Sequence, residues 1–388
     1  MKYKVFWKNP GYKVRPSLKK DIECDYLIVG GGITGVSLAY FLAKDGAKNV
    51  ILVEKEKIAS GATGRAAGTL VLKGELDLKD IIKDYGKEKG RLYWKANHEG
   101  FKLIKELIKK EKIDCDFEKM HTLYCGYKNK TYNDVVEEYK AEKQFEKKTK
   151  LLVGNEIKKE INTNMFDKVV LSYDHGISVN PLKLTQNISM ALENKGVKVY
   201  ENTHVTKVGK NIAKTPHAKI KFKKLIWAID SAHPSEKVKN LKSTIIVTRP
   251  LTNKEVESTG LKGKIIWDSK ENYKYTKLTK DNRMLVGFGG IIVHKKHRIY
   301  DPHFPHLKEL KNFIPKIFPR LNPDIEYTWS GSFGITDDYY PIIEFKKNQI
   351  SIAGAGSQVV CVMAAKYLAD KLAGKKSYLD NFFKNKLS

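Results

Sequence analysis

Two kinds of hydrophobic pattern divide the chain. Short continuous apolar runs lie at 25–29, 50–53, 224–230 and 350–353, with helical patterns beside them. Such runs are typical of strands buried on both faces of a parallel sheet in an α/β fold. From about residue 240 to 325, apolar and polar positions alternate with a period of two, which predicts a second, mostly antiparallel unit. The expected fold class is therefore α/β with an added antiparallel α+β domain.

The same patterns place the individual elements. Helices are predicted over 36–44, 182–194 and 358–373, and in the lysine-rich stretch 78–112. Further strands are predicted at 122–125, 197–200, 203–208 (as an edge strand), 244–249, 264–268, 273–278 and 283–290. Because the parallel-type strands are far apart in sequence, the parallel sheet must be assembled from at least three separated stretches of the chain.

The first apolar run leads directly into the glycine pattern G-x-G-x-x-G, formed by Gly30, Gly32 and Gly35, and then into the first helix. The second run ends in Glu54. In such a unit the first glycine allows a tight turn, the second lets a pyrophosphate approach the backbone, and the third lets helix and strand pack closely. The helix N-terminus attracts phosphates, and an acid roughly 20 residues later binds ribose hydroxyls. These features together predict a dinucleotide site.

Composition changes this picture little. The 388 residues carry a formal net charge of +28, but only seven of the 72 basic residues are arginine, and the lysines are spread along the chain. Arginine is better suited than lysine to bidentate phosphate and base contacts, so specific nucleic-acid binding is not expected. No segment approaches the roughly 20 apolar residues that span a bilayer, and the first residues do not form a secretory signal. A cytoplasmic protein is expected, with solubility and anion attraction as effects of its charge.

Five further segments carry a resemblance to a known family: 61–68 (GATGRAAG), 176–181 (GISVNP), 227–230 (WAID), 281–287 (DNRMLVG) and 336–343 (TDDYYPII). Together with the glycine turn and its acidic partner, they resemble the flavin-dependent D-amino acid oxidase, glycine oxidase and sarcosine oxidase superfamily. The chain looks most similar to the gamma-glutamylputrescine oxidase-like members. The similarity covers nearly the whole chain and is specific to the superfamily, but not to one substrate.

The resemblance implies a Rossmann-like FAD-binding domain of the glutathione reductase type and a mostly antiparallel α+β substrate domain. The implied boundaries are an N-terminal arm at 1–24, an FAD-binding domain at 25–105, 165–235 and 326–388, and a substrate domain at 106–164 and 236–325. The residues implied to bind FAD lie in the glycine turns and beside them: Gly30, Gly32, Ile33, Thr34, Gly35, Glu54, Lys55, Gly61, Ala62, Thr63, Arg65, Ala66, Ala67, Gly68, Val205, Ala228, Gly331, Gly354, Gly356, Ser357 and Gln358.

The chain departs from the family pattern in two places. Close relatives have S-G-H-G before the last helix, whereas residues 354–357 are GAGS, so any role of that histidine is lost. No cysteine lies in 331–341, where covalent-flavin members carry their attachment thiol, so non-covalent FAD is implied. The four cysteines are far apart, without a C-x-x-C pair, and are expected to be buried thiols and not metal ligands or disulfides: Cys24, Cys115, Cys125 and Cys361. Flavin attachment to one of them is the less favoured alternative.

The implied activity is oxidation of the C–N bond of an amine or amino acid (a D-amino acid, glycine, sarcosine or an N-substituted amine). Hydride transfer to the flavin would give an imine, which water hydrolyses. This chemistry needs orientation and a dry site more than acid–base groups, so the lack of a recognisable triad is expected. The electron acceptor would be dioxygen, a quinone or another protein. The alternatives are an FAD-dependent dehydrogenase of a 2-hydroxy acid or of glycerol phosphate, and a non-catalytic flavoprotein subunit.

Four residues are candidates for contact with the substrate. Arg249 can clamp a carboxylate bidentately, and the basic charge of the chain favours an anionic substrate. Tyr273 and Tyr275 are two apart on a predicted strand, so they face the same way and can form an aromatic wall. Trp329 precedes the Gly331 turn and can face the flavin. The alternatives are a surface position for Arg249 and ordinary packing for the three aromatic residues.

Overall fold

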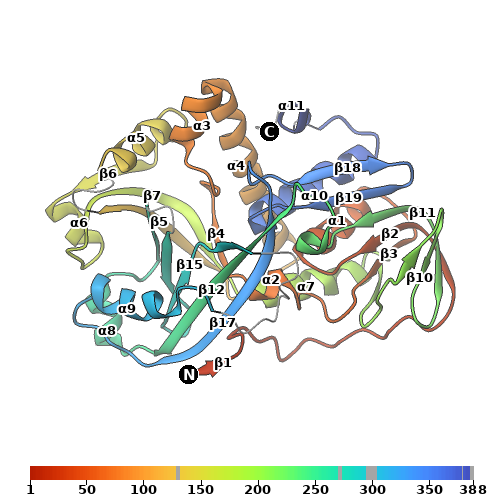
Figure 1. The fold of residues 1–388 in the computed structure, drawn as a ribbon, viewed down its shortest axis with the longest axis horizontal. Coiled ribbons are helices and arrows are strands. Elements are labelled where there is room, and N and C mark those ends of the chain that lie inside the picture. Colours follow the sequence, from red (N-terminus) through yellow and green to blue (C-terminus); the bar gives the residue numbers. More distant parts are fainter. Residues whose placement is uncertain (128–131, 270–272, 294–303, 378, 385–388) are drawn as a thin grey trace.

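The computed structural model describes residues 1–127, 132–269, 273–293, 304–377 and 379–384. Two β-sheets organise these residues, a smaller one at the right of Figure 1 and a larger one at the left. The two-part α/β and α+β architecture expected from the sequence is confirmed.

The smaller sheet carries the predicted parallel strands. Its path is β18 (Ile342–Lys346), β19 (Gln349–Ala353), β11 (Lys219–Trp227), β2 (Ile22–Val29), β3 (Val50–Val53) and β8 (Lys198–Tyr200), and β10 (Ile212–Lys214) and β9 (Lys207–Val208) lie beyond β11. The strands from β19 to β8 pair in parallel, and β18 pairs antiparallel with β19. Apolar side chains on both faces of β2 and β3 are buried, which explains their continuous apolar sequences.

One face of this sheet shares a core with four helices: α1 (Ile33–Lys44), α4 (Lys87–Lys110), α7 (Pro181–Glu193) and α10 (Gln358–Leu372). Local signals start two of them. The Asn180 side chain accepts a hydrogen bond from the backbone N–H of Lys183, and Pro181 occupies the first turn of α7. Ser357 caps α10 in the same way through the N–H of Val360.

The larger sheet is mostly antiparallel. Its path is β1 (Lys2–Tyr3), β17 (Ile325–Ile335), β12 (Lys239–Pro250), β15 (Arg283–Phe288), β14 (Lys274–Leu278), β13 (Lys264–Asp268), β5 (Glu118–Tyr127), β7 (Phe166–Ser178) and β4 (Thr69–Val71), with β16 (Ile291–Val293) beside β12 and β6 (Thr149–Val153) beside β7. Only β1 with β17 and β13 with β5 pair in parallel within the described ranges. A second core lies between this sheet and α6 (Asn155–Glu160), α8 (Asn253–Thr259) and α9 (Leu307–Ile317).

The remaining helices flank these layers. The predicted helical stretch 78–112 is two helices, α3 (Leu78–Tyr85) and α4, because Gly86 between them adopts a positive φ of 88°. The others are α5 (Tyr132–Lys143), which packs on α3, the short α2 (Ala62–Arg65), the 3₁₀ turn η1 (Asp230–Ala232) and α11 (Asp380–Lys384).

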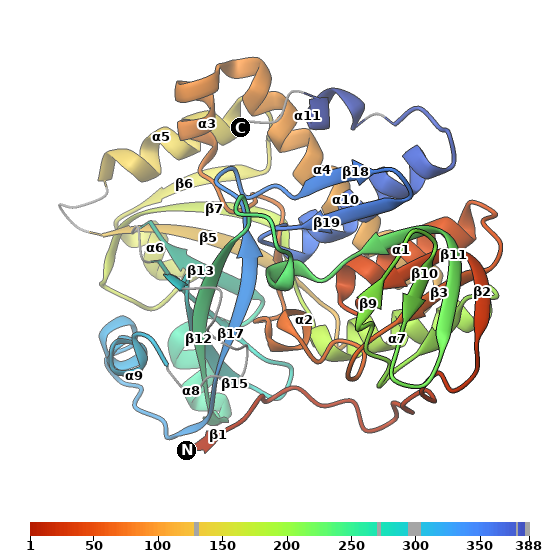
Figure 2. The ribbon, with the colours of Figure 1, turned by 45° about the vertical axis from the view of Figure 1, so that its right-hand side comes forward.

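Sheet pairing cuts across the predicted domain boundaries. β7, β17 and β4 all belong to the larger sheet, although the sequence analysis placed 166–178, 326–335 and 69–71 with the FAD-binding segments. In Figures 1 and 2, β12 and β17 run side by side to the middle of the molecule, where Ile335 bridges Ala355. Strands this long join the two units directly. The arm at 1–24 is not separate either, since β1 pairs with β17 and β2 begins at Ile22.

The predicted edge strand at 203–208 is wrong over 203–206. Only Lys207–Val208 forms β9. The N–H of Thr203 donates to the carbonyl of Glu54 at 2.8 Å, and its hydroxyl accepts from the N–H of Leu18 at 3.0 Å. These bonds draw the segment across the end of β3, which places Val205 beside the ribose-binding acid predicted from the sequence.

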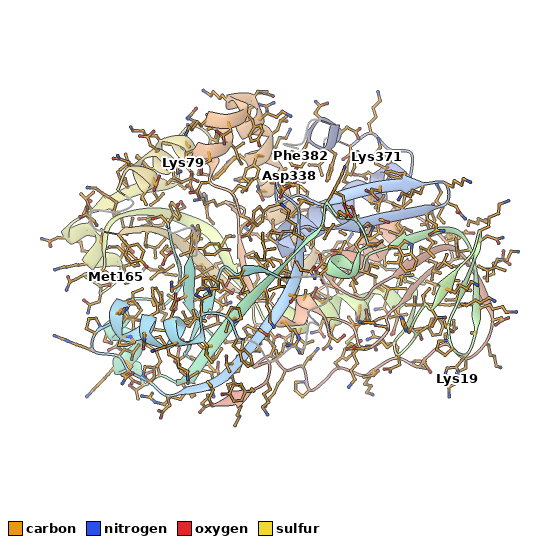
Figure 3. The ribbon with its side chains drawn as sticks, in the orientation of Figure 1. Lys19, Lys79, Met165, Asp338, Lys371 and Phe382 are labelled. Carbon is orange, nitrogen blue, oxygen red and sulfur yellow. The ribbon has the colours of Figure 1, made fainter. Side chains whose placement is uncertain are left out.

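Charged side chains cover much of the outside. Lys19 and Lys371 protrude from separate parts of the molecule, whereas Asp338 and Phe382 lie inside (Figure 3). None of the helices in the described part of the chain is long and apolar enough to cross a membrane.

Candidate functional site

A cavity of about 930 Å³ lies where the two sheets meet. The smaller sheet contributes the carboxyl ends of β2, β3 and β11, and the larger sheet contributes residues of β12, β13, β14 and β17. The lining includes most of the predicted site residues: Gly30, Gly32, Ile33, Thr34, Glu54, Lys55, Gly61, Ala62, Thr63, Arg65, Ala66, Ala67, Gly68, Val205, Ala228, Gly331, Gly356, Ser357, Gln358, Tyr273 and Tyr275. Among the described lining residues, Gly35, Gly354, Arg249 and Trp329 are missing.

The first glycine turn requires glycine at two positions. Gly30 has a φ of 116°, and a Cβ there would stand 2.3 Å from the carbonyl oxygen of Ala228. A Cβ on Gly35 would stand 2.0 Å from the carbonyl oxygen of Gly30, so β2, α1 and β11 can approach this closely only without side chains. α1 begins at Ile33 without a side-chain cap on Gly32. The N–H of Ile33 donates to the hydroxyl of Thr63 at 3.1 Å, and the partial positive charge at the N-terminus of α1 suits phosphate groups.

Glu54 is fixed at the end of β3. Its carboxylate accepts from the N–H of Gly31 at 2.7 Å and from the N–H of Glu56 at 2.9 Å. The residue is only 9 % exposed, and burial raises the pKa of its carboxyl while the two N–H donors lower it. The remaining lone pairs of a carboxylate held in this way can accept the two hydroxyls of a ribose.

The second glycine loop crosses the cavity floor through α2. Cβ atoms on Gly64 and Gly68 would stand 2.2 and 2.0 Å from the carbonyl oxygens of Ala59 and Val179. Two indole N–H groups hold the loop from below: Trp7 donates to Ala66 and Trp329 donates to Arg65, each at 2.8 Å. Trp329 is 2 % exposed and supports the loop from behind. Its position before the Gly331 turn had suggested instead that it faces the flavin.

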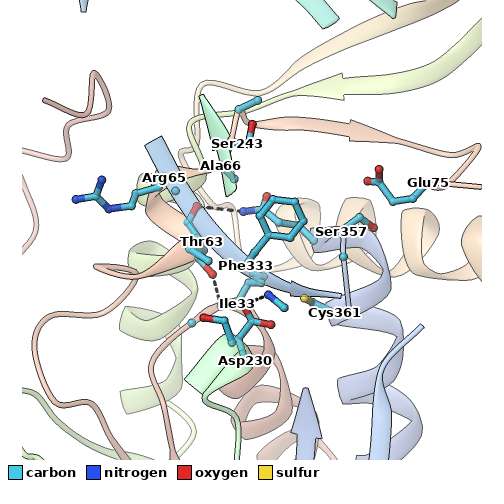
Figure 4. A pocket seen from close by; sticks show the side chains of 18 of the residues that line it. Ile33, Thr63, Arg65, Ala66, Glu75, Asp230, Ser243, Phe333, Ser357 and Cys361 are labelled. Carbon is cyan, nitrogen blue, oxygen red and sulfur yellow. Dashed lines mark hydrogen bonds between the residues drawn. The ribbon is translucent and has the colours of Figure 1, made fainter. Parts of the chain in front are cut away.

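A third turn closes the site near the C-terminus. Gly354 and Gly356 adopt φ values of 77° and 68°, and Gln358 donates from Nε2 to the carbonyl of Thr63 at 3.3 Å (Figure 4). The carboxylate of Asp230 accepts from the N–H of Gly334 at 3.0 Å and thereby ties β11 to β17. The pKa of Asp230 is raised, because the effect of burial is larger than the opposing effect of three backbone N–H donors.

One cysteine differs from expectation. Cys24, Cys115 and Cys125 are buried, but Cys361 is only partly buried and lines the cavity from the first turn of α10. Burial raises the pKa of its thiol to about 12, so the thiolate, the form that reacts as a nucleophile, is disfavoured at neutral pH.

The two predicted tyrosines line the cavity, Tyr275 from β14 and Tyr273 from the position just before it. Their rings lie 6.3 Å apart, over Gly287 and Gly289 of the adjoining β15 segment, where a Cβ would stand 2.0 Å from Tyr275 and 2.8 Å from Tyr273. The hydroxyl of Tyr273 donates to Oε2 of Glu75 at 3.0 Å. The sequence interpretation did not identify Glu75, nor the lining residues Trp267, Phe333 and Tyr339.

Arg249, the predicted carboxylate clamp, is not among the residues that line the cavity. Its guanidinium forms a two-pronged pair with Glu255, with Nη1 and Nη2 at 2.9 and 2.7 Å from the carboxylate oxygens. Glu255 also completes the capping box at the start of α8 with Thr252. This pairing lowers the pKa of Glu255 to about 2. Arg249 therefore binds an internal carboxylate at the beginning of a helix.

The arrangement fits FAD. The N-terminus of α1, the carboxylate of Glu54 and a glycine loop form one continuous lining that leads to the aromatic wall on β14. The pyrophosphate would lie at the N-terminus of α1, the adenosine ribose at Glu54, and the flavin along the loop from Gly61 to Gly68. At Gly30, Gly35, Gly64 and Gly68, any side chain would collide with backbone oxygens.

Comparisons with known proteins agree with this assignment. The chain is 29 % identical to the gamma-glutamylputrescine oxidoreductase of Escherichia coli, over 94 % of this chain and 87 % of that protein. The structure of glycine oxidase from Geobacillus kaustophilus superimposes with a TM-score of 0.77 at 18 % identity, covering 92 % of this chain and 97 % of that one. An FAD-bound L-alpha-glycerophosphate oxidase from Mycoplasma pneumoniae gives a TM-score of 0.68 at 18 % identity, covering 91 % and 95 %.

The structural similarities show a shared fold, at identities too low to transfer a substrate. The sequence model of the DAO family, described as FAD dependent oxidoreductase, matches residues 25–371, which is most of the chain. Family and cofactor expected from the glycine turns and the ribose-binding acid are thus confirmed. The chain belongs to the DAO family of FAD-dependent oxidoreductases.

Proposed function

We propose that this enzyme oxidises the C–N bond of a small amine or amino acid to an imine, which water then hydrolyses to a carbonyl compound and an amine. The observation that carries the proposal is the continuity of the cavity. The predicted FAD-binding residues and the tyrosine wall on β14 line the same space, so a substrate held by the wall lies in the same cavity as the cofactor. The relative from Escherichia coli, which bears the name of an amine substrate, supports the same reaction class.

FAD supplies the chemistry by accepting a hydride equivalent from the substrate carbon. The residues of the chain orient the substrate and exclude water. Tyr273 and Tyr275 present partly buried rings to the cavity, and Phe333 of β17 faces the same space (Figure 4). These apolar surfaces exclude water from the carbon that is oxidised.

The alternatives make different demands on the cavity. A 2-hydroxy acid or glycerol phosphate needs a positive charge for its anionic group. The cavity-lining Lys73 is already paired with Asp77 at 2.7 Å, and Lys79 with Asp80 at 2.9 Å. The glycerophosphate oxidase shares the fold, so the fold alone does not decide between the substrates.

The test is anaerobic mixing of the FAD-loaded protein with a panel of amines, amino acids and 2-hydroxy acids while the flavin absorbance is followed. Bleaching by an amine or amino acid is expected. Bleaching by hydroxy acids or glycerol phosphate alone would replace the proposal with the dehydrogenase alternative. A fully loaded flavin that no compound of the panel reduces would instead favour a non-catalytic subunit. Admitting dioxygen or adding a soluble quinone to the reduced protein then identifies the acceptor.

A further inference from the structure

The far end of the cavity, beyond the residues that fit FAD, combines a carboxylate with aromatic walls. Glu75 lies there with Trp267, Tyr273, Tyr275 and Tyr339. We propose that Glu75 binds a positively charged ammonium group of the substrate, so that the enzyme acts on cationic alkylamines and not on substrates held by a carboxylate. This inference rests on the proposed amine oxidation and names its substrate class.

The backbone holds Glu75 in a fixed position. Gly74 before it adopts a φ of 86°, and a Cβ there would stand 2.5 Å from the hydroxyl of Tyr93. The same hydroxyl accepts from the N–H of Leu76 at 2.9 Å and lies 3.2 Å from its carbonyl oxygen. Tyr93 is 1 % exposed, so it is a rigid support. The carboxylate is thus presented to the cavity by a segment tied down on both sides.

Glu75 has no cationic partner among the residues that the structure describes. Its carboxylate accepts from the hydroxyl of Tyr273, and no ion pair joins it to a basic side chain among the residues that the structure describes. Lys73, two positions earlier, lies between Asp77 at 2.7 Å and Glu138 at 3.0 Å. Burial raises the pKa of Glu75, and the bond from Tyr273 lowers it. A partly buried carboxylate without a counter-charge is costly, and an ammonium ligand would supply that charge.

The surrounding surface suits a cation with an alkyl chain. The faces of tyrosine and tryptophan rings attract ammonium groups, and the same rings pack against methylene groups. Burial raises the pKa of Tyr273 and Tyr339, and the nearby Glu75 charge raises it further. Both hydroxyls therefore remain neutral donors at physiological pH.

An anionic substrate would meet the wrong sign at this end. Arg65 donates from Nη1 to the carbonyl of Ser330 at 2.9 Å, and its side chain points away from Phe333 and Glu75 (Figure 4). Lys79 lies between Asp80 and Asp134. Lys73 and Lys79 are thus paired and Arg65 is directed elsewhere, so none of these three offers a free positive charge to the predicted anionic substrate.

Binding can be tested without turnover. tert-Butylammonium has no hydrogen on its α-carbon and cannot be oxidised to an imine, and pivalate has the same shape with a negative charge. Calorimetric titration of the oxidised, FAD-loaded protein should show binding of tert-butylammonium and no comparable binding of pivalate. Pivalate binding as tightly as tert-butylammonium would overturn the inference.

Variants assign the charge to Glu75. Glu75→Gln keeps the size of the side chain and should raise the Kd of tert-butylammonium and the KM of oxidised alkylamines about tenfold or more, as expected for loss of a charge-assisted hydrogen bond. Glu344→Gln removes the same charge from β18, away from the cavity, and should change neither value. Tyr273→Phe should weaken binding less than Glu75→Gln, because the ring and the carboxylate remain. If Glu75→Gln does not fold, Tyr273→Phe and the comparison of tert-butylammonium with pivalate still test the inference.

The two proposals fail in different ways. Flavin reduction by glycine or D-amino acids but not by alkylamines would refute the role of Glu75 and leave C–N oxidation intact. The same holds if Glu75→Gln folds, binds FAD and retains the wild-type Kd for tert-butylammonium. If neither class of amine reduces the flavin, the proposed function itself is wrong.

Discussion

Lys277 gives a quantitative test of how the site is built. This lysine of β14 is fully buried, and its Nζ donates to the carbonyl of Gly68 at 2.6 Å and to the hydroxyl of Ser178 at 2.8 Å. It therefore braces the second glycine loop from the larger sheet. Burial lowers the pKa of Lys277 from 10.5 to about 7, since the charged ammonium loses its hydration.

The sign of the effect on stability follows from proton binding. Between pH 7 and 10.5 the unfolded chain holds the lysine proton and the folded chain does not, so the free energy of unfolding rises with pH across this window. A depression of 3.5 pKa units costs the folded state about 5 kcal/mol at pH values below 7. Lys277→Met removes this titration. Between pH 7.5 and 9.5 the wild type should gain about 2.5 kcal/mol relative to the variant.

The assay is urea unfolding of both proteins at several pH values, with the difference in unfolding free energy plotted against pH. Only the slope is interpreted, because the methionine also loses two hydrogen bonds. The carbonyl of Gly68 keeps its bond from the N–H of Val179 at 2.9 Å, so it is not left without a donor. Lys280→Met, at an exposed position, controls for the loss of one charge. A difference curve for Lys277→Met that is flat from pH 7.5 to 9.5 would show that the lysine is charged when buried.

Three further predictions concern the cofactor and Arg249. Gly35→Ala should abolish FAD binding, because its Cβ would stand 2.0 Å from the Gly30 oxygen. Binding is measured by flavin absorbance after incubation with excess FAD, and the control Gly11→Ala, which has open space around the new Cβ, should bind FAD normally. FAD should be bound non-covalently, so acid precipitation should release all the flavin, and Cys361→Ser should hold as much FAD as the wild type. Flavin that stays in the wild-type pellet but is lost from the Cys361→Ser pellet would show a covalent link. Arg249→Met should leave the KM for every oxidised amine unchanged and alter stability by about 1 kcal/mol or less, as is usual for a partly exposed ion pair; a raised KM would restore the clamp.

The parts of the site that the sequence predicted are those coded locally. The glycine turn, the acid at the end of β3 and the glycine loop each lie within a short segment whose spacing fixes its geometry. Glycines at positions 35 and 64 are required by the backbone oxygens of Gly30 and Ala59, which lie close by in sequence, so the residue type itself carries the signal. The same holds for helix starts such as Asn180–Pro181, where one side chain and one ring set the boundary.

The errors come from contacts between distant segments. The sequence analysis assigned β7 and most of β17 to the FAD-binding unit because they adjoin its motifs. Their strand partners are β5 and β12 of the larger sheet. Arg249 had the right chemistry for a clamp, but Glu255, six residues later, uses that chemistry at a helix start. Glu75 had no motif around it, and its importance depends on Tyr273, which is 198 residues away. One indirect signal was available, the glycine at position 74, since its positive φ marks a constrained segment.

The charge of the substrate shows most clearly why composition could not replace structure. A net charge of +28 describes the whole chain, whose lysines include Lys19 and Lys371 on separate parts of the surface. Charges on a surface are screened over about 8 Å at physiological ionic strength, so they can attract an anion without deciding what binds inside a pocket. In the cavity, Lys73 and Lys79 are neutralised by carboxylates, and Glu75 has no such partner among the described residues. The local field at the far end of the cavity is therefore opposite in sign to the charge of the molecule, and it favours an ammonium group there.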